Sequence, residues 1–142
     1  MHVKNSTAED YQELAFYTLE HSDKDYFIHQ HIVDTFQAQT ADEFTKPIAI
    51  VFSLAGLYLF TKQGYTGKMV QQVHMKMARN KIPWPAIELP VNRGDITISN
   101  VLESPPGTAR DEMIKKWSIS VWHAFENSHQ VIKSTIRKTT GI

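Results

Sequence analysis

Apolar residues recur along most of this chain at three- and four-residue intervals, the spacing of an amphipathic helix. Capping-box patterns open the first such stretch, at Ser6–Glu9 and Thr7–Asp10, and Pro47 opens the third. The pattern predicts five helices, with bounds near 6–22, 22–39, 47–64, 66–79 and 108–137. It therefore indicates an all-α fold, a bundle of four to five helices in a single domain over residues 1–142.

The stretch from Ile48 to Phe60 is apolar on all sides and is predicted to be the central helix of the bundle. It is shorter than the roughly 20 residues that span a bilayer, so we interpret it as a buried helix of a soluble protein. Ala55 and Gly56 in its middle allow a neighbouring helix to approach closely.

A long, proline-rich connection precedes the last helix, from Asn80 to Gly107. Connections of this length without regular structure are uncommon in compact domains and are often functional. We expect its apolar residues to anchor it across the bundle. Residues 95–99 alternate as a short strand would, whereas Thr97 or Ser99 could equally cap a short helix that runs to Leu102.

The chain contains no cysteine, which excludes disulfides, thiolate metal ligands and a cysteine nucleophile. Cysteine-free composition fits a reducing compartment. The first residues also lack the apolar stretch of a secretory signal. Together these features predict a cytoplasmic protein that does not enter the membrane.

The formal net charge is zero, but the charges are segregated. Residues 1–43 contain nine acids against Lys4 and Lys24, and residues 44–87 contain six basic residues and no acid. One interpretation is a basic face for phosphate or an acidic partner. The favoured one is that the acidic first half packs beside the basic middle, so that the two fields cancel. Nucleic-acid-binding domains usually carry a basic excess, so the balance does not favour nucleic acid as a partner.

The most informative polar residues are His31 and Asp34, which lie three residues apart in the second predicted helix and so share a side. His129 lies among apolar residues of the last predicted helix. Imidazole and carboxylate groups that face a core are costly unless they are paired, hydrogen-bonded or bound to a ligand. These three residues could form a metal site for zinc, iron, manganese or nickel. The favoured alternative is a buried polar lock in which Asp34 hydrogen-bonds a histidine or an indole.

Further residues could line the same site. Gln39 and Trp122 lie on the same or adjacent turns, and Trp117 is five residues from Trp122, so the two indoles do not share a helix face. Two functional classes remain open. One is a polar cavity that binds a metal ion or small molecule, with His31 or His129 as the base if it is catalytic and Asp34 orienting it. The other is a non-enzymatic module that binds a protein partner or forms a homodimer.

Three stretches resemble one bacterial family. Residues 31–39 are similar to a His-x-x-Asp-x-Tyr-x-x-Gln signature, 89–101 to a Pro…Gly-x-Leu-Thr-Val-x-Asp-Val segment, and 117–129 to a Trp-x-x-x-Val-Trp-x-Ala…His segment. These belong to a family of uncharacterised proteins, domain of unknown function 5946, and the resemblance runs from about Tyr11 to Ile136. It implies a small helical protein whose matching polar and aromatic positions are His31, Asp34, Gln39, Trp117, Trp122 and His129.

Two departures from the family pattern bear on the metal hypothesis. Many members begin with a Cys-x-x-Cys-like element that could hold zinc, and this chain has no cysteine. Members also often have a histidine in the central helix near the position of Ser53, which weakens a shared metal site here. The resemblance therefore supports the fold and the location of a site more than any chemistry.

Overall fold

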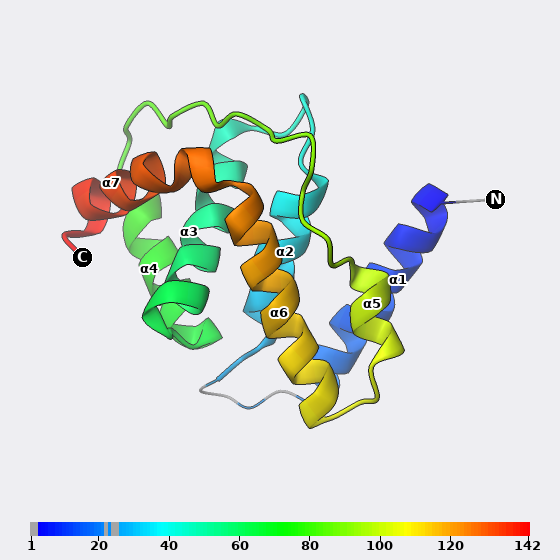
Figure 1. Ribbon diagram of the computed structural model, residues 1–142. Coiled ribbons are helices and arrows are strands. Elements are labelled where there is room, and N and C mark those ends of the chain that lie inside the picture. Colours follow the sequence, from blue (N-terminus) through cyan, green and yellow to red (C-terminus); the bar gives the residue numbers. More distant parts are fainter. Residues whose placement is uncertain (1–2, 22, 24–25) are drawn as a thin grey trace.

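The computed structural model describes residues 3–21, 23 and 26–142 (Figure 1). Seven α-helices and a single-turn 3-10 helix make up its regular structure: α1 (Val3–Glu20), α2 (His29–Thr40), α3 (Pro47–Gln63), α4 (Gly67–Ala78), α5 (Ile98–Glu103), α6 (Thr108–Ala124), η1 (Glu126–Ser128) and α7 (His129–Thr140). These residues form no strand, which confirms the all-α prediction. The predicted count of four to five helices was too small.

The helices lie in three groups (Figure 1). α2 and α6 pack together in the middle, α1 and α5 lie on one side, and α3, α4 and α7 lie on the other. One hydrophobic cluster draws buried residues from α1 through α7. The segment from Asn80 to Thr97, which we call the strap, has no helix or strand and crosses one end of the bundle (Figure 1).

α3 is the central helix that its apolar sequence predicted. Pro47 occupies its first turn, and Gly64 ends it in the left-handed conformation at φ 69°. Its middle is buried on all sides because α2, α4, α6 and α7 all pack against it. Within the described part of the chain, no helix is both long and apolar enough to cross a membrane.

α2 begins at His29, later than the predicted start near residue 22 or 23. Phe27 has a positive φ of 46°, which an α-helix does not tolerate. The backbone carbonyl of Tyr26 accepts a hydrogen bond from the N–H of Gly67 on α4 instead of a helical partner, at 2.6 Å. Ser22, the earlier of the two predicted starting points, lies outside the described residues.

α1 and α5 also correct the predicted bounds. α1 begins at Val3, before the predicted caps at Ser6 and Thr7, because no proline or glycine precedes them to stop it. In the connection, the N–H of Thr97 donates to Oδ1 of Asn100 at 2.9 Å and caps α5. The short-helix alternative is therefore confirmed, and the strand at 95–99 was wrong.

The last predicted helix is broken in two. α6 ends at Ala124, and α7 leaves it in a different direction (Figure 1). The carbonyl of Trp122 contacts the N–H of Phe125 and Nε2 of His129, at 3.1 and 2.8 Å. These contacts replace the regular helical ladder at the break, and they turn α7 onto α3 and α4.

Candidate functional site

His31 is completely buried in the first turn of α2. Its imidazole stacks on the Phe60 ring of α3, with ring centroids 3.5 Å apart and the planes 7° from parallel. Tyr26 meets it edge-on at 5.9 Å. Burial lowers the pKa of His31 from 6.5 to about 3, because the desolvated ring resists protonation. Neither ring nitrogen has a hydrogen-bond partner.

Asp34 lies one turn after His31 and is also buried. Oδ1 accepts a hydrogen bond from Nε2 of Gln30 at 3.1 Å, while Oδ2 has no partner. Burial raises the pKa of Asp34 well above its ordinary value, and the Gln30 bond opposes this only in part. Burial therefore favours the uncharged forms of both His31 and Asp34.

A glycine of α3 makes room for the carboxyl group. A methyl group on Gly56 would overlap Oδ2 of Asp34, so α2 and α3 can pack at this depth only without a side chain there. The sequence predicted this close approach at Gly56. The predicted polar lock is not formed as expected, because Asp34 bonds Gln30 rather than a histidine or an indole.

The segment from Tyr26 to Ile28 covers His31. Tyr26 is 41% exposed and contacts the His31 ring from the solvent side. The segment is held at α4, where Gly67 donates its N–H to Tyr26 and where a side chain at Gly67 would overlap the carbonyl of Phe27. Access to His31 from this side therefore requires the segment to move away from α4.

Gln39 joins α2, α6 and the strap. Its Oε1 accepts a hydrogen bond from the indole Nε1 of Trp117 at 2.9 Å, and its Nε2 donates to the carbonyl of Ile96 at 2.8 Å. Arg93 adds hydrogen bonds from Nη1 to the carbonyls of Ala38 and Gln39. The amide of Gln39 and the indole N–H of Trp117 are thus engaged within the protein and hold the strap in place.

We expect Gln39→Ala to lower the free energy of unfolding by about 1–2 kcal/mol, because it leaves the buried Trp117 N–H unpaired. Loss of the Ile96 contact should also speed amide hydrogen exchange in residues 93–97. Urea unfolding followed by circular dichroism measures the first effect, and hydrogen exchange measures the second. The neighbouring exposed position Gln37 provides the control, since Gln37→Ala should change neither.

Trp122 and His129 form a second aromatic pair at the break between α6 and α7. Their rings stack 3.7 Å apart at 5°, and Nε2 of His129 contacts the carbonyl of Trp122. Burial is the main cause that lowers the pKa of His129, although the Trp122 carbonyl opposes it. Nε1 of Trp122 is buried without a hydrogen-bond partner. His129 is therefore used locally to turn the chain.

The predicted trio of His31, Asp34 and His129 does not form a metal centre in this structure. Among the described residues, no three histidine, aspartate or glutamate side chains are grouped so that they could hold one metal ion. His31 and Asp34 share a helix face as predicted, but His129 is engaged with Trp122 on another element. The helix break at Phe125, which the sequence pattern did not predict, redirects His129.

Comparison with known proteins identifies the chain at the level of a family. The family model of DUF5946, a family of unknown function, matches residues 5–126. The chain belongs to DUF5946. The matched region includes five of the six positions named from the resemblance, and it ends before His129 and α7. Neither the curated proteins nor the solved structures gave a match to this chain.

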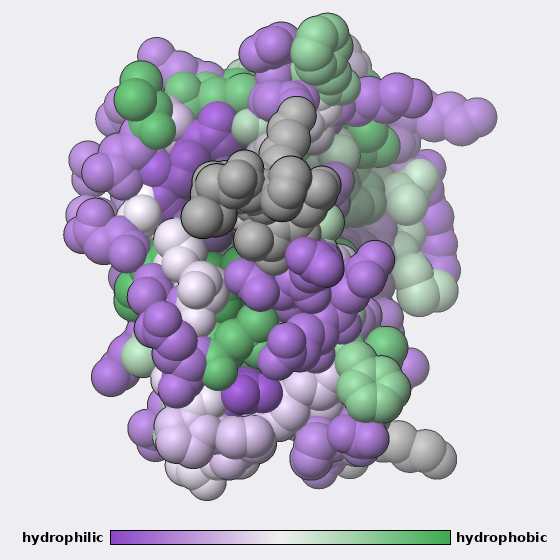
Figure 2. Space-filling view, turned by 90° about the vertical axis from the view of Figure 1, so that its right-hand side faces the viewer, coloured by the Kyte–Doolittle hydropathy of each residue, from purple (hydrophilic) through white to green (hydrophobic). Residues whose placement is uncertain are grey.

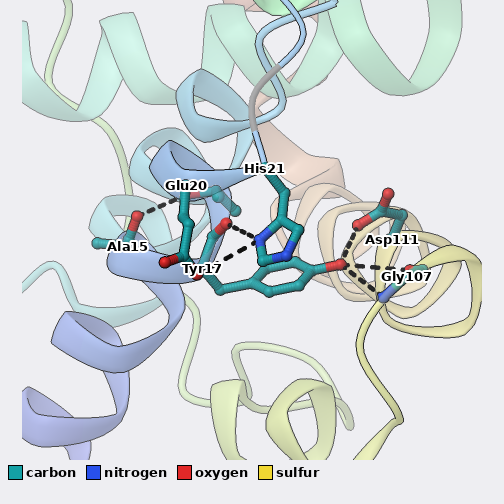
Figure 3. Close-up of polar contacts among 7 residues, drawn as sticks. Ala15, Tyr17, Glu20, His21, Gly107 and Asp111 are labelled. Carbon is teal, nitrogen blue, oxygen red and sulfur yellow. Dashed lines mark hydrogen bonds and ion pairs between the residues drawn. The ribbon is translucent and has the colours of Figure 1, made fainter.

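This DUF5946 protein also has a polar cluster that sequence reasoning missed (Figure 3). The hydroxyl of Tyr17 on α1 donates to Oδ1 of Asp111 at 2.9 Å and accepts from the N–H of Gly107 at 2.8 Å. Arg110 lies over the Tyr17 ring, with Cζ 4.8 Å from its centroid. Tyr17 and Asp111 are 94 residues apart, so no local pattern signals their contact. The cluster fixes the end of α1 against the start of α6.

Proposed function

We propose that this protein binds a small, uncharged, hydrogen-bonding organic molecule between α2 and α3, at His31 and Asp34. The supporting observation is that both ring nitrogens of His31 and Oδ2 of Asp34 are buried without hydrogen-bond partners. Leaving a buried polar group unpaired costs about 1–3 kcal/mol. A ligand that hydrogen-bonds these atoms would recover much of that cost, whereas an apolar one would not.

The surroundings of the pair favour a flat ligand. Phe60 and Tyr26 border His31 with aromatic rings, and planar groups stack on such surfaces. A neutral imidazole and a neutral carboxylic acid each offer one donor and at least one acceptor. A planar carboxamide, with an adjacent donor and acceptor of its own, matches both groups.

The same chemistry argues against zinc, iron, manganese or nickel as the resident ligand. A metal would need Asp34 to lose its proton, and burial raises the pKa of that carboxyl. The pair would also supply only two protein ligands, fewer than structural or catalytic zinc sites commonly use. Elemental analysis of the purified protein, with and without chelator treatment, tests the metal alternative directly.

The pair also fits binding better than proton abstraction. A general base works best when its pKa lies near the working pH. With a pKa of about 3, His31 is a weak base in this closed arrangement. The function that we propose is therefore capture of a ligand, with the Tyr26–Ile28 segment as the part that opens.

Benzamide is a suitable probe because it is planar, uncharged and carries an amide. We expect it to raise the thermal unfolding midpoint and to shift the imidazole NMR signals of His31. Benzoate adds a charge and toluene removes the hydrogen bonds, so both should act more weakly. His74 provides an internal reference, since its Nε2 already contacts the carbonyl of Phe52 at 2.8 Å.

Asp34→Leu is the matched variant, because leucine has a similar shape and no polar atoms. It should keep the fold and lose the response to benzamide. The proposed polar site is contradicted if no probe, added up to the limit of its own solubility, shifts the NMR signals of His31. It is also contradicted if toluene shifts these signals as strongly as benzamide does.

A further inference from the structure

The outer face of α1 combines acidic residues with exposed apolar ones. Most of its exposed residues recur at three- and four-residue intervals and so form one stripe, consisting of Glu9, Gln12, Glu13, Phe16, Leu19 and Glu20. Phe16 is 66% exposed and Leu19 is 53% exposed, three residues apart. Figure 2 views the side of the molecule that carries α1 and α5, where hydrophobic groups stand among hydrophilic ones. We call this face the acidic stripe.

The outer face of α4 has the opposite charge and a hollow. A pocket of about 400 Å³ is lined there by Met69, Gln72, Met75, Lys76, Arg79 and the C-terminal Ile142, among others. Met69 and Met75 are 41% and 60% exposed. Methionine side chains adapt their shape to an apolar partner, and the two cations border the same hollow. We call this face the basic groove.

The two faces complement each other but cannot meet within one molecule. α1 and α4 lie on opposite sides of the bundle (Figure 1). The acidic outer face of α1 and the basic outer face of α4 thus stay apart, although α2 of the acidic first half packs against α3 and α4 of the basic middle. In a second copy, the stripe would bring an exposed phenylalanine and several carboxylates to a methionine-lined hollow with lysine and arginine at its edge.

We propose that the acidic stripe of one copy binds the basic groove of a second copy, so that the chain associates head to tail. The apolar contact of Phe16 with Met69 and Met75 supplies burial, and the charges on the two faces fix the direction. Because the two surfaces are different, each copy keeps one stripe or one groove free after pairing. When this interface is repeated from copy to copy, the copies assemble into a closed ring or an open chain.

Two single variants of the full chain test this arrangement. Phe16→Asp removes the central apolar side chain of the acidic stripe, and Met75→Asp places a carboxylate in the basic groove where an apolar contact is needed. Both positions are exposed, so the fold should persist. Analytical ultracentrifugation of the unmodified protein should show a mass that rises with concentration. The rise should weaken between about 0.05 M and about 0.5 M salt, because salt screens exposed charges. Each variant alone should stay monomeric.

Mixing the two variants gives the decisive result. The intact groove of Phe16→Asp can bind the intact stripe of Met75→Asp, so an equimolar mixture should form a one-to-one pair that grows no further. Phe44→Asp, at a position 84% exposed and outside both faces, should associate as the unmodified protein does. Phe16→Ser and Met75→Ser form a second pair of variants if either aspartate variant fails to fold.

Three outcomes would overturn the proposal. The first is an unmodified protein that is monomeric at every concentration, which would leave the two faces to other partners. The second is association that survives in either single variant, which would indicate a symmetric or different interface. The third is a mixture of the two variants that stays monomeric.

Discussion

Gly56→Ala is expected to lower the free energy of unfolding by about 1–2 kcal/mol, although alanine is the better helix former. The added methyl group would overlap Oδ2 and Cγ of Asp34 and would come within 3.3 Å of a methyl of Val70. Asp34 is buried and cannot swing into solvent, so α2 or α3 must shift. Overpacking of this kind costs about 1–3 kcal/mol and occasionally more. The gain in helix propensity returns only about 1 kcal/mol.

Urea unfolding followed by circular dichroism measures this effect. The double variant Asp34→Ala with Gly56→Ala is the control, because removing the carboxyl group removes the overlap. The loss of stability in the double variant should be smaller than the sum of the losses in Asp34→Ala and Gly56→Ala. A Gly56→Ala protein as stable as the unmodified one would show that the carboxyl group does not lie against α3.

His31 should make the protein lose stability in acid, and His31→Phe should remove most of that loss. The unfolded imidazole takes up a proton below pH 6.5, whereas the native one resists until about pH 3. Between these values the unfolded state binds more protons, so stability falls as the pH falls. At about 1.4 kcal/mol for each tenfold change in proton affinity, the loss approaches about 4–5 kcal/mol at the lower limit.

Over part of this pH range, the contribution of Asp34 to stability changes with pH in the direction opposite to that of His31. Its native carboxyl keeps a proton that the unfolded one releases above about pH 3.8, so its contribution falls as the pH rises. The two slopes partly cancel in the unmodified protein. In His31→Phe, which keeps a ring against Phe60, stability should fall less in acid than in the unmodified protein. Asp34 still opposes the smaller acid loss that comes from His29, His74 and His129, whose pKa burial also lowers.

Unfolding by urea at a series of pH values between about 3.5 and about 8 tests this expectation. The control is His123→Phe, the same substitution at an exposed position, which should leave in place the acid loss that comes from His31. If His31→Phe and the unmodified protein have parallel profiles, the native imidazole takes up its proton as readily as the unfolded one.

The sequence predicted those features that local spacing determines. The central helix, its Pro47 start and its Gly64 end were all correct, because each depends on residues within a few positions. The shared face of His31 and Asp34 was correct for the same reason, since three residues are one helical turn. The close packing of α2 against α3 at Gly56 was predictable because glycine has no side chain to keep a neighbouring helix away.

Contacts between distant segments were not predictable in this way. The bonds from Gln39 to the strap and the contact of Tyr17 with Asp111 depend on how whole helices are placed. His129 was expected beside His31 because it lies among apolar residues of a helix that was predicted to run from 108 to 137. The turn at Phe125 depends on a carbonyl contact that a pattern of apolar residues does not encode.

The docking of α7 has a practical consequence for work on this family. The DUF5946 match ends at Glu126, yet α7 buries Ile132 and Ile136 against α3 and α4. A recombinant fragment cut at the end of the match would leave the apolar surface of the central helix open to water. The limit of the shared sequence is therefore not a limit at which this polypeptide can be safely truncated.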